Sequence, residues 1–294
     1  MYKFKTASGV DVPMIGLGTF PFQGEIMASV LKSAYRIGYR LIDTADDYRG
    51  ESGIGLAISS GVFDRKDIFI QTKISNDTAF ADEPLAGCFF TRYSSFMKRH
   101  SVSEIVREKV YNSLAEMKTD YLDSLLIHYP YYGYYEDIWA EMIRMRDEGL
   151  VRFIGVSNFR ERHIEKLKAV GSIPDINELY ISPIGTKNEL INYCKINEIC
   201  PMTYSPLMDI AKGRITEPDV CDLMKKYDKT LSQIILRWNV DRGCLPLAKS
   251  KNTMRLEENF NIFDFKLESE EVESINKLNQ NYQILTESKI CPGV

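Results

Sequence analysis

The hydrophobic positions of this chain form short apolar runs that alternate with longer runs of helical periodicity. The short runs are continuous rather than alternating, as is typical of parallel strands that are covered on both faces. Strands are predicted at Tyr39–Asp43, Ile68–Thr72, Ser124–His128, Phe153–Val156, Ile176–Tyr180, Cys200–Tyr204, Leu245–Ala248 and Ile262–Asp264. Amphipathic helices are predicted at Glu25–Ile37, Ile105–Met117, Tyr135–Asp147, Arg160–Val170, Lys187–Asn197 and Leu231–Val240.

Strands that alternate with helices indicate βαβ units and a parallel sheet, so the fold class is α/β. Eight strands favour closure into a (β/α)8 TIM barrel, because closure leaves no unpaired edge; an open doubly wound sheet is the alternative. Before these strands, Phe4–Ile15 with Ser8-Gly9 at its centre predicts an N-terminal β-hairpin that closes the floor of the barrel. Residues 1–294 are expected to form a single barrel domain, since this length is normal for one.

One segment interrupts the alternation. Residues 76–103, between the second predicted strand and the next helix, form a long loop insertion with several aromatic and basic side chains. Loops of this length in a compact domain are usually functional or mobile. In a barrel the insertion leaves the C-terminal end of a strand, beside any active site. A structural cap or an oligomer contact is the alternative.

Composition narrows the class of protein. Hydrophobic residues make up 44% and charged residues 27%, as expected of a globular protein with a large core. The net charge of −4 argues against a nucleic-acid surface, and no apolar stretch approaches the roughly 20 residues of a membrane span. The six cysteines include no CxxC pair and the three histidines are far apart, so no metal site is expected. The protein is expected to be cytoplasmic, with neither a nucleic acid nor a membrane as partner.

Four polar residues stand at or just after the ends of three consecutive predicted strands. Asp43 ends a strand and Tyr48 follows it, Lys73 closes FIQTK, and His128 closes the next strand. Because barrel strands end at one face, these side chains are expected to converge. Together they make a proton donor: Lys73, held charged by Asp43, lowers the pKa of Tyr48, and His128 orients a substrate oxygen. The set contains no obvious nucleophile and therefore needs a partner that supplies electrons.

A phosphate site is predicted near the C-terminus. The chain has neither GxGxxG nor GxxxxGK[ST], which excludes the Rossmann and P-loop routes to a nucleotide. Instead, Leu247-Ala-Lys-Ser-Lys-Asn252 follows a strand and leads into a short helix that contains Arg255. Backbone N–H groups at a helix start, together with Lys249, Ser250 and Arg255, suit a phosphate. A solvated turn is the alternative.

Over nearly its whole length the chain resembles the aldo-keto reductases. The motifs MIGLGTF, YRLIDTADDY, LIHYP, RFIGVSNF, TYSPL, QIILRW and RLEENFNIFDF occur in order, each at the matching position of the barrel pattern. The resemblance implies a catalytic tetrad of Asp43, Tyr48, Lys73 and His128, in which Tyr48 is the general acid.

The resemblance also implies NADPH (NADP⁺) as the cofactor. The residues that it assigns to cofactor binding are Thr19, Ser157, Asn158, Glu178, Tyr204, Ser205, Leu207, Lys249, Ser250, Asn252, Arg255, Glu258 and Asn259. Tyr204 matches the residue that stacks on the nicotinamide ring, while Ser157 and Asn158 match donors to its carboxamide. The group from Lys249 to Arg255 matches the pocket of the 2′-phosphate, whose charge favours NADPH over NADH.

The chain departs from the family pattern at INELYISP, where the family has VNQ-x-E-x-HP. Glu178 replaces the glutamine, and a carboxylate accepts hydrogen bonds but donates none, so the grip on the carboxamide is expected to differ. Tyr129 stands where a tryptophan often follows the catalytic histidine. With Tyr131, Tyr132 and other nearby tyrosines it forms either a wall for a ring-bearing or sugar-like substrate or packing under a loop.

The expected function is therefore NADPH-dependent reduction of a small aldehyde or ketone to an alcohol by hydride transfer. One alternative is an NADPH-binding regulatory protein of the same fold with little turnover. A second is a barrel isomerase or hydrolase that uses Lys73 and His128 without a nicotinamide. The resemblance makes a monomer or weak homodimer the expected state.

Overall fold

The computed structural model describes residues 3–5, 9, 11–75, 101–130 and 133–284, and its centre is a closed parallel barrel. Neighbouring strands around the barrel follow the order β10-β3-β4-β5-β6-β7-β8-β9. The barrel strands are β3 (Gly16–Gly18), β4 (Leu41–Asp43), β5 (Phe69–Ile74), β6 (Leu122–Ile127), β7 (Val151–Ser157), β8 (Ile176–Tyr180), β9 (Cys200–Tyr204) and β10 (Leu245–Ala248). The predicted (β/α)8 barrel is confirmed.

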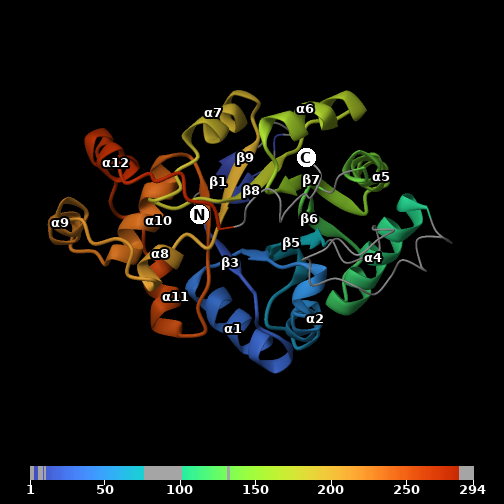
Figure 1. Ribbon diagram of the computed structural model, residues 1–294. Coiled ribbons are helices and arrows are strands. Elements are labelled where there is room, and N and C mark those ends of the chain that lie inside the picture. The colour runs from blue at the N-terminus through green and yellow to red at the C-terminus, as the bar shows by residue number, and fades with distance from the viewer. Residues whose placement is uncertain (1–2, 6–8, 10, 76–100, 131–132, 285–294) are drawn as a thin grey trace.

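Helices surround the strands on all sides (Figure 1). They are α1 (Gly24–Ile37), α2 (Glu51–Ser59), α4 (Val102–Met117), α5 (Tyr135–Asp147), α6 (Glu161–Val170), α7 (Asn188–Ile196), α8 (Met208–Ala211), α9 (Pro218–Tyr227), α10 (Leu231–Asp241), α11 (Thr253–Phe260) and α12 (Ser269–Asn276). The 3₁₀ helix η1 (Asp46–Tyr48) follows β4, and the 3₁₀ helix η2 (Arg65–Asp67) precedes β5. Each helix that was predicted from amphipathic periodicity is present within a few residues of its expected bounds.

The predicted strand at Ile262–Asp264 is wrong. Ile262 is buried, but it lies between α11 and α12, and its carbonyl oxygen accepts from Arg237 Nη1 at 3.1 Å. This short apolar run therefore packs on α10 and pairs with no strand. The eighth barrel strand is instead β3, which precedes all the predicted ones, so the insertion follows the third barrel strand.

Glycine at position 16 is required by the packing around β3. A Cβ atom there would lie 2.3 Å from Leu41 Cδ2 and 2.5 Å from Leu247 Cδ2, the side chains of the two neighbouring strands. Gly16 pairs with Leu247 and Leu17 pairs with Ile42, so this short strand joins the first and last parts of the barrel. A Gly-Leu-Gly sequence has weak strand character, which is why the pattern of apolar runs does not reveal it.

The N-terminal residues lie at the end of the barrel opposite the candidate site. β1 (Lys3–Lys5) and β2 (Asp11–Pro13) pair antiparallel. The turn of the predicted hairpin falls at residues 6–8 and 10, outside the described residues. Val12 is fully buried in one apolar cluster with Leu41 and Phe69, the first residues of β4 and β5. This strand pair therefore closes the barrel interior from its N-terminal end.

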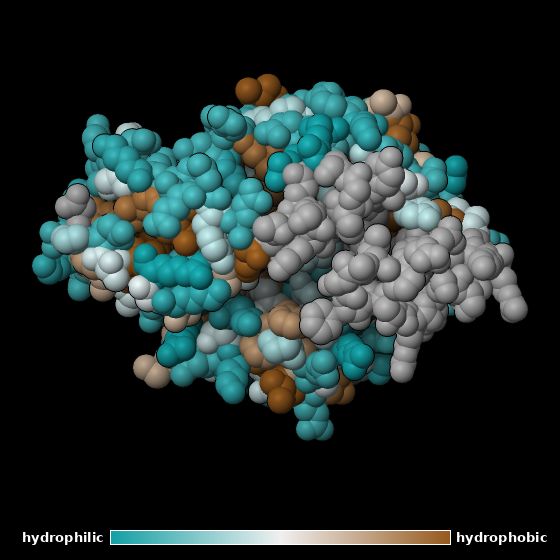
Figure 2. All heavy atoms as spheres, viewed as in Figure 1, coloured by the Kyte–Doolittle hydropathy of each residue, from teal (hydrophilic) through white to brown (hydrophobic). Residues whose placement is uncertain are grey.

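Most of the predicted insertion, residues 76–100, lies outside the described residues, as do Tyr131 and Tyr132. The last three residues of the insertion are Ser101, the N-cap of α4, and Val102 and Ser103, which begin this helix. Ser101 caps this helix: its Oγ accepts from the backbone N of Glu104 at 3.3 Å, and its backbone N donates to Glu104 Oε2 at 2.7 Å. Hydrophilic side chains cover most of the described surface in Figure 2. Within the described residues, no helix is long and apolar enough to span a membrane.

Candidate active site

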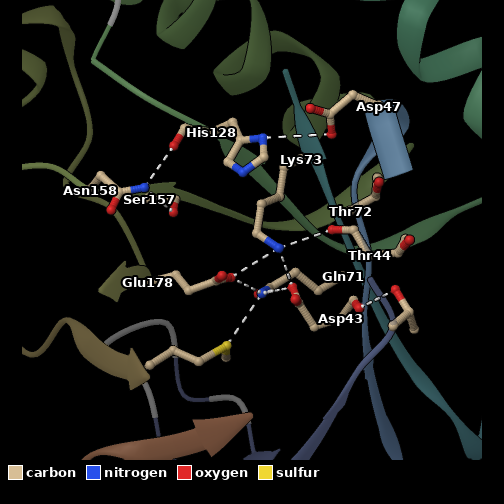
Figure 3. A network of polar contacts seen from close by, with 12 residues as sticks. Asp43, Thr44, Asp47, Gln71, Thr72, Lys73, His128, Ser157, Asn158 and Glu178 are labelled. Carbon is tan, nitrogen blue, oxygen red and sulfur yellow. Dashed lines mark hydrogen bonds and ion pairs between the residues drawn. The ribbon is translucent and has the colours of Figure 1, made fainter. Parts of the chain in front are cut away.

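The four predicted catalytic residues lie at the C-terminal ends of three neighbouring barrel strands. Asp43 is the last residue of β4, Lys73 is the next to last of β5, and His128 directly follows β6. Tyr48 ends η1, the short helix after β4. Figure 3 shows the side chains of Asp43 and Lys73 meeting inside the barrel with His128 above them. The fold thus brings together residues that are far apart in sequence.

Lys73 is the centre of the site, and its side chain is completely buried. Its Nζ lies 2.6 Å from Asp43 Oδ1 and 3.3 Å from Glu178 Oε2, and it donates to the carbonyl oxygen of Thr44 at 3.0 Å. Burial alone lowers the pKa of an ammonium, but the two carboxylates outweigh burial and hold the pKa of Lys73 well above its usual value. Lys73 is therefore positively charged at neutral pH.

Glu178 reaches the same cluster from β8, on the other side of the barrel (Figure 3). Gln71 Nε2 donates to Asp43 Oδ1 at 2.8 Å and to Glu178 Oε2 at 3.0 Å, so one amide bridges the two acids. Burial, reinforced by Asp43, raises the pKa of Glu178 to about 8. This shift favours the protonated form, in which Glu178 can donate as well as accept a hydrogen bond.

Tyr48 lies against the charged cluster and the histidine. Lys73 Nζ is 5.3 Å from the centre of the Tyr48 ring, and the His128 ring is 5.8 Å away at 73°. Burial raises the pKa of Tyr48 above its usual value; Lys73 lowers it, and Asp43 and Glu178 raise it again. Lys73 lowers the pKa of Tyr48 as predicted, but burial outweighs this effect, so the net shift is upward. The phenol stays protonated, as a proton donor must be.

His128 is neutral. Burial, followed by the charge of Lys73, holds its pKa well below the usual value. The imidazole stacks on Tyr129 with ring centres 4.5 Å apart, and the His128 carbonyl oxygen accepts from Asn158 Nδ2 at 3.2 Å. A neutral, firmly held imidazole is suited to hydrogen-bonding a substrate oxygen rather than to supplying a proton.

Two aspartates of η1 differ in their surroundings. Asp46 is paired, with its Oδ2 2.9 Å from Lys109 Nζ and its Oδ1 accepting from the backbone N of Ser75. Asp47 faces His128 instead: its Oδ1 is 3.9 Å from His128 Nδ1, and 35% of its side chain is exposed. Burial and then Asp46 raise the pKa of Asp47 to about 6.

The residues predicted to bind the nicotinamide end of a cofactor lie on the neighbouring strands of the same rim. Ser157 ends β7, and Asn158 follows it with a positive φ of 65°. Asn158 Nδ2 donates to Ser157 Oγ at 3.0 Å, and Asn158 Oδ1 accepts from Tyr204 Oη at 2.9 Å. Tyr204 ends β9, one strand beyond Glu178. A row of polar groups therefore continues from the proposed catalytic residues around the rim.

Three further residues predicted to bind the cofactor follow β3 and β9 at the same rim of the barrel. Thr19 follows β3 and is buried, and its Oγ1 donates to the carbonyl oxygen of Asp43 at 2.8 Å. Ser205 is exposed after β9 with a positive φ of 52°, and Leu207 is the half-buried residue before α8. Thr19 thus fixes the end of the strand that carries Asp43.

The predicted phosphate group lies after β10, at the start of α11. Lys249, Lys251 and Arg255 are exposed, and none of the ion pairs in the described parts of the chain involves them. Asn252 caps α11, since its Oδ1 accepts from the backbone N of Arg255 at 3.2 Å. Ser250 Oγ accepts from the backbone N of Asn252 at 3.0 Å. Three uncompensated cations at a helix start are suited to an anion.

The two predicted adenine contacts lie further along α11. Glu258 is partly exposed, and its Oε1 accepts from Thr230 Oγ1 at 2.7 Å, while Asn259 is buried. The structure thus already gives Glu258 a partner on the turn before α10.

Residues 14–280 match the family model of the aldo/keto reductase family. The chain belongs to this family. This aldo/keto reductase is 35% identical over 284 residues to the uncharacterized oxidoreductase YtbE of Bacillus subtilis (strain 168), with 94% of this chain and 92% of the relative covered. It is 32% identical over 283 residues to methylglyoxal reductase DkgA of Escherichia coli (strain K12), with 95% and 94% covered. The family resemblance inferred from the sequence is confirmed.

Solved structures of the family have the same fold. The crystal structure of Bombyx mori aldo-keto reductase AKR2E4 in complex with NADP superposes with a TM-score of 0.81 at 29% identity, covering 98% of this chain and 95% of that one. An aldo/keto reductase from Brucella melitensis gives a TM-score of 0.81 at 31% identity, with 94% and 99% covered.

Sequence reasoning missed three side chains that shape this site. Gln71 lies with Thr72 and Lys73 in β5, and three successive polar residues in a short buried strand were a usable signal. Asp47 stands directly before Tyr48 in the motif YRLIDTADDY. Only Asp43 and Tyr48 of this motif were assigned to the site. Lys251 lies within the predicted phosphate segment and joins Lys249 there as a second cation.

Proposed function

We propose that this aldo/keto reductase uses NADPH to reduce small aldehydes or ketones to alcohols, with Tyr48 as the general acid. The observation that carries the proposal is the buried ammonium of Lys73, 2.6 Å from Asp43 and 5.3 Å from the centre of the Tyr48 ring. A protonated phenol beside a fixed positive charge can release its proton to a substrate oxygen, and the ammonium stabilises the phenolate that remains.

NADPH, when bound, would supply the hydride for the carbonyl carbon, and Tyr48 supplies the proton for the carbonyl oxygen, so the products would be an alcohol and NADP⁺. His128 orients that oxygen through a hydrogen bond, because it is neutral and buried beside Tyr48. Asp43 and Gln71 hold Lys73 and Glu178 in place. Proton donation and orientation of the substrate oxygen are thereby assigned to side chains at one rim of the barrel.

The residues of the rim fit a phosphorylated dinucleotide. Ser157, Asn158 and Tyr204 supply polar contacts for the nicotinamide end, and protonated Glu178 can both donate to and accept from an amide. Lys249, Lys251 and Arg255 supply the cations that a 2′-phosphate needs. The related Bombyx mori structure is in complex with NADP.

The substrate panel begins with small dicarbonyls, since relatives are named methylglyoxal reductase and glyoxal reductase. NADPH oxidation would be measured against these, simple aldehydes, ketones and open-chain sugars, with wild type and Tyr48→Phe. We expect the variant to lose about 100- to 10,000-fold in kcat, the usual contribution of a positioned general acid, while NADPH binding is kept.

Tyr129→Phe is the matched control, because Tyr129 is the other phenol beside His128. An equal loss in this variant would contradict the assignment of the proton donor. No turnover by the wild type despite tight NADPH binding would overturn the proposed reductase and favour the regulatory alternative.

A further inference from the structure

Asp47 brings a carboxylate to the mouth of the site, beside the groups that would hold a substrate oxygen. Its Oδ1 lies 3.9 Å from His128 Nδ1, and 35% of its side chain is exposed (Figure 3). Its charge acts on both phenols of the site, raising the pKa of Tyr48 and of Tyr129. A small molecule held by Tyr48 and His128 therefore also meets Asp47.

Among the described residues no Lys or Arg forms an ion pair with Asp47, although the charges of Lys73 and Lys109 act on it from further away. Lys109 pairs with Asp46, and Lys73 is shared between Asp43 and Glu178. His128, which is closest, is neutral at pH 7. Asp47 thus presents an exposed carboxylate that no Lys or Arg of the described residues pairs with directly.

We propose that Asp47 selects substrates by charge: it excludes carbonyl compounds with a carboxylate next to the carbonyl carbon, such as 2-oxo acids, and favours neutral ones. Neutral substrates with a hydroxyl group beside the carbonyl gain a further contact, since that hydroxyl can donate to the carboxylate. The proposal rests on the proposed function, because Tyr48 and His128 must place the carbonyl. Like charges a few ångströms apart near a protein surface weaken binding by about ten-fold or more.

The selection depends on pH. Asp47 is faced by Asp46 and Tyr48 on its own helix, by Lys73 on β5, by Lys109 on α4, and by His128 and Tyr129 after β6. Burial and Asp46 raise its pKa to about 6, whereas a 2-oxo acid stays ionised well below that value. Discrimination against anions is therefore largely present at neutral pH and weakens as the pH falls through about 6.

The test compares acids with their neutral esters. The values of kcat/KM for glyoxylate and ethyl glyoxylate, and for pyruvate and ethyl pyruvate, are measured for wild type, Asp47→Asn and Asp46→Asn. We expect Asp47→Asn to raise the acid-to-ester ratio by about ten-fold or more, mainly through a lower KM for the acid. Asp46→Asn removes the neighbouring carboxylate, which faces Lys109, and should keep the wild-type ratio.

A second measurement follows the same ratios from about pH 8 to about pH 5. The wild-type ratio should rise as the pH falls, and that of Asp47→Asn should stay flat. An unchanged ratio in Asp47→Asn, or an equal rise in Asp46→Asn, overturns the role of Asp47 alone. If wild type reduces neither the esters nor any compound of the wider carbonyl panel, the proposed function fails and this inference with it.

Discussion

Glu178 changes the charge balance around the proposed catalytic lysine. With Asp43 and Glu178 both ionised, Lys73 would be outweighed by two buried negative charges, and a proton on Glu178 removes the excess. The Gln71 amide holds the two acids together. Because the pKa of Glu178 is raised to about 8, the folded protein binds a proton that the unfolded chain releases above about pH 4.3.

This linkage predicts the pH dependence of stability. A raised carboxyl pKa stabilises the fold fully below the unfolded value, and the contribution is lost as the pH rises toward about 8. Relative to wild type, Glu178→Gln should therefore gain up to about 1.4 kcal/mol in the free energy of unfolding per pH unit between about pH 5 and pH 8. Urea unfolding at several pH values measures it, with the exposed Glu257→Gln as control. Parallel curves for Glu178→Gln and wild type would mean that Glu178 is ionised in the folded protein.

The four proposed catalytic residues could be located from sequence, because each stands where a predicted strand ends. The pKa of Tyr48 could not be predicted, since it depends on burial and on Glu178, which reaches the site from the opposite side of the barrel. Contacts across a barrel leave no trace in the spacing of residues along one strand. For the same reason the bridge that Gln71 makes between Asp43 and Glu178 emerges only from the structure.

At the scale of secondary-structure elements, all six predicted helices are present, whereas one of the eight predicted strands is wrong. α5 coincides with its predicted range, Tyr135–Asp147, because Ile138, Trp139, Met142 and Met145 repeat at helical spacing and are fully buried. β3 has only three residues, two of them glycines, so neither length nor composition distinguishes it from a turn. Ile262 is equally apolar in a non-strand segment. Burial alone therefore does not tell a strand from a packed connection.

The tight packing of β3 predicts unequal effects of two similar substitutions. Gly16→Ala should destabilise the protein by about 1–3 kcal/mol, because the new methyl group overlaps Leu41 and Leu247. Gly18→Ala lies on the same face of the same strand, and its Cβ would meet only Lys249 Cβ at 3.9 Å. It should change the stability by less than about 0.5 kcal/mol. Equal losses in thermal or urea unfolding would mean that crowding at Gly16 is relieved by movement of the leucines.

At the scale of the whole molecule, the proposed catalytic residues and most of the residues proposed to bind the cofactor lie on different parts of one barrel rim. β4, β5 and β6 carry the proposed catalytic residues, and β7 to β10 carry the residues proposed to bind the cofactor. Lys249 and Arg255 lie at the far end of this second group, next to β3. The order of strands around the barrel thus sets the order in which a long ligand meets its contacts.

This division predicts that Lys249 and Arg255 affect only the phosphorylated cofactor. In Lys249→Ala and Arg255→Ala we expect the Kd of NADPH to rise by about ten-fold or more, the range for one charge-assisted hydrogen bond, while the Kd of NADH changes by less than about two-fold. Fluorescence titration measures both. Lys225→Ala, on α9 and paired with Asp222, is the control. A parallel loss of NADH affinity would place the phosphate elsewhere.

Closure of the barrel through β3 and β10 has a consequence for synthesis on the ribosome. β3 lies near the start of the chain and β10 near its end, so the sheet keeps two open edges until the residues of β10 have emerged. All four proposed catalytic residues are made well before then, yet they would line an unclosed sheet whose unpaired strands invite aggregation. Nascent chains that stop short of β10 should therefore be clients of chaperones rather than partly active enzymes.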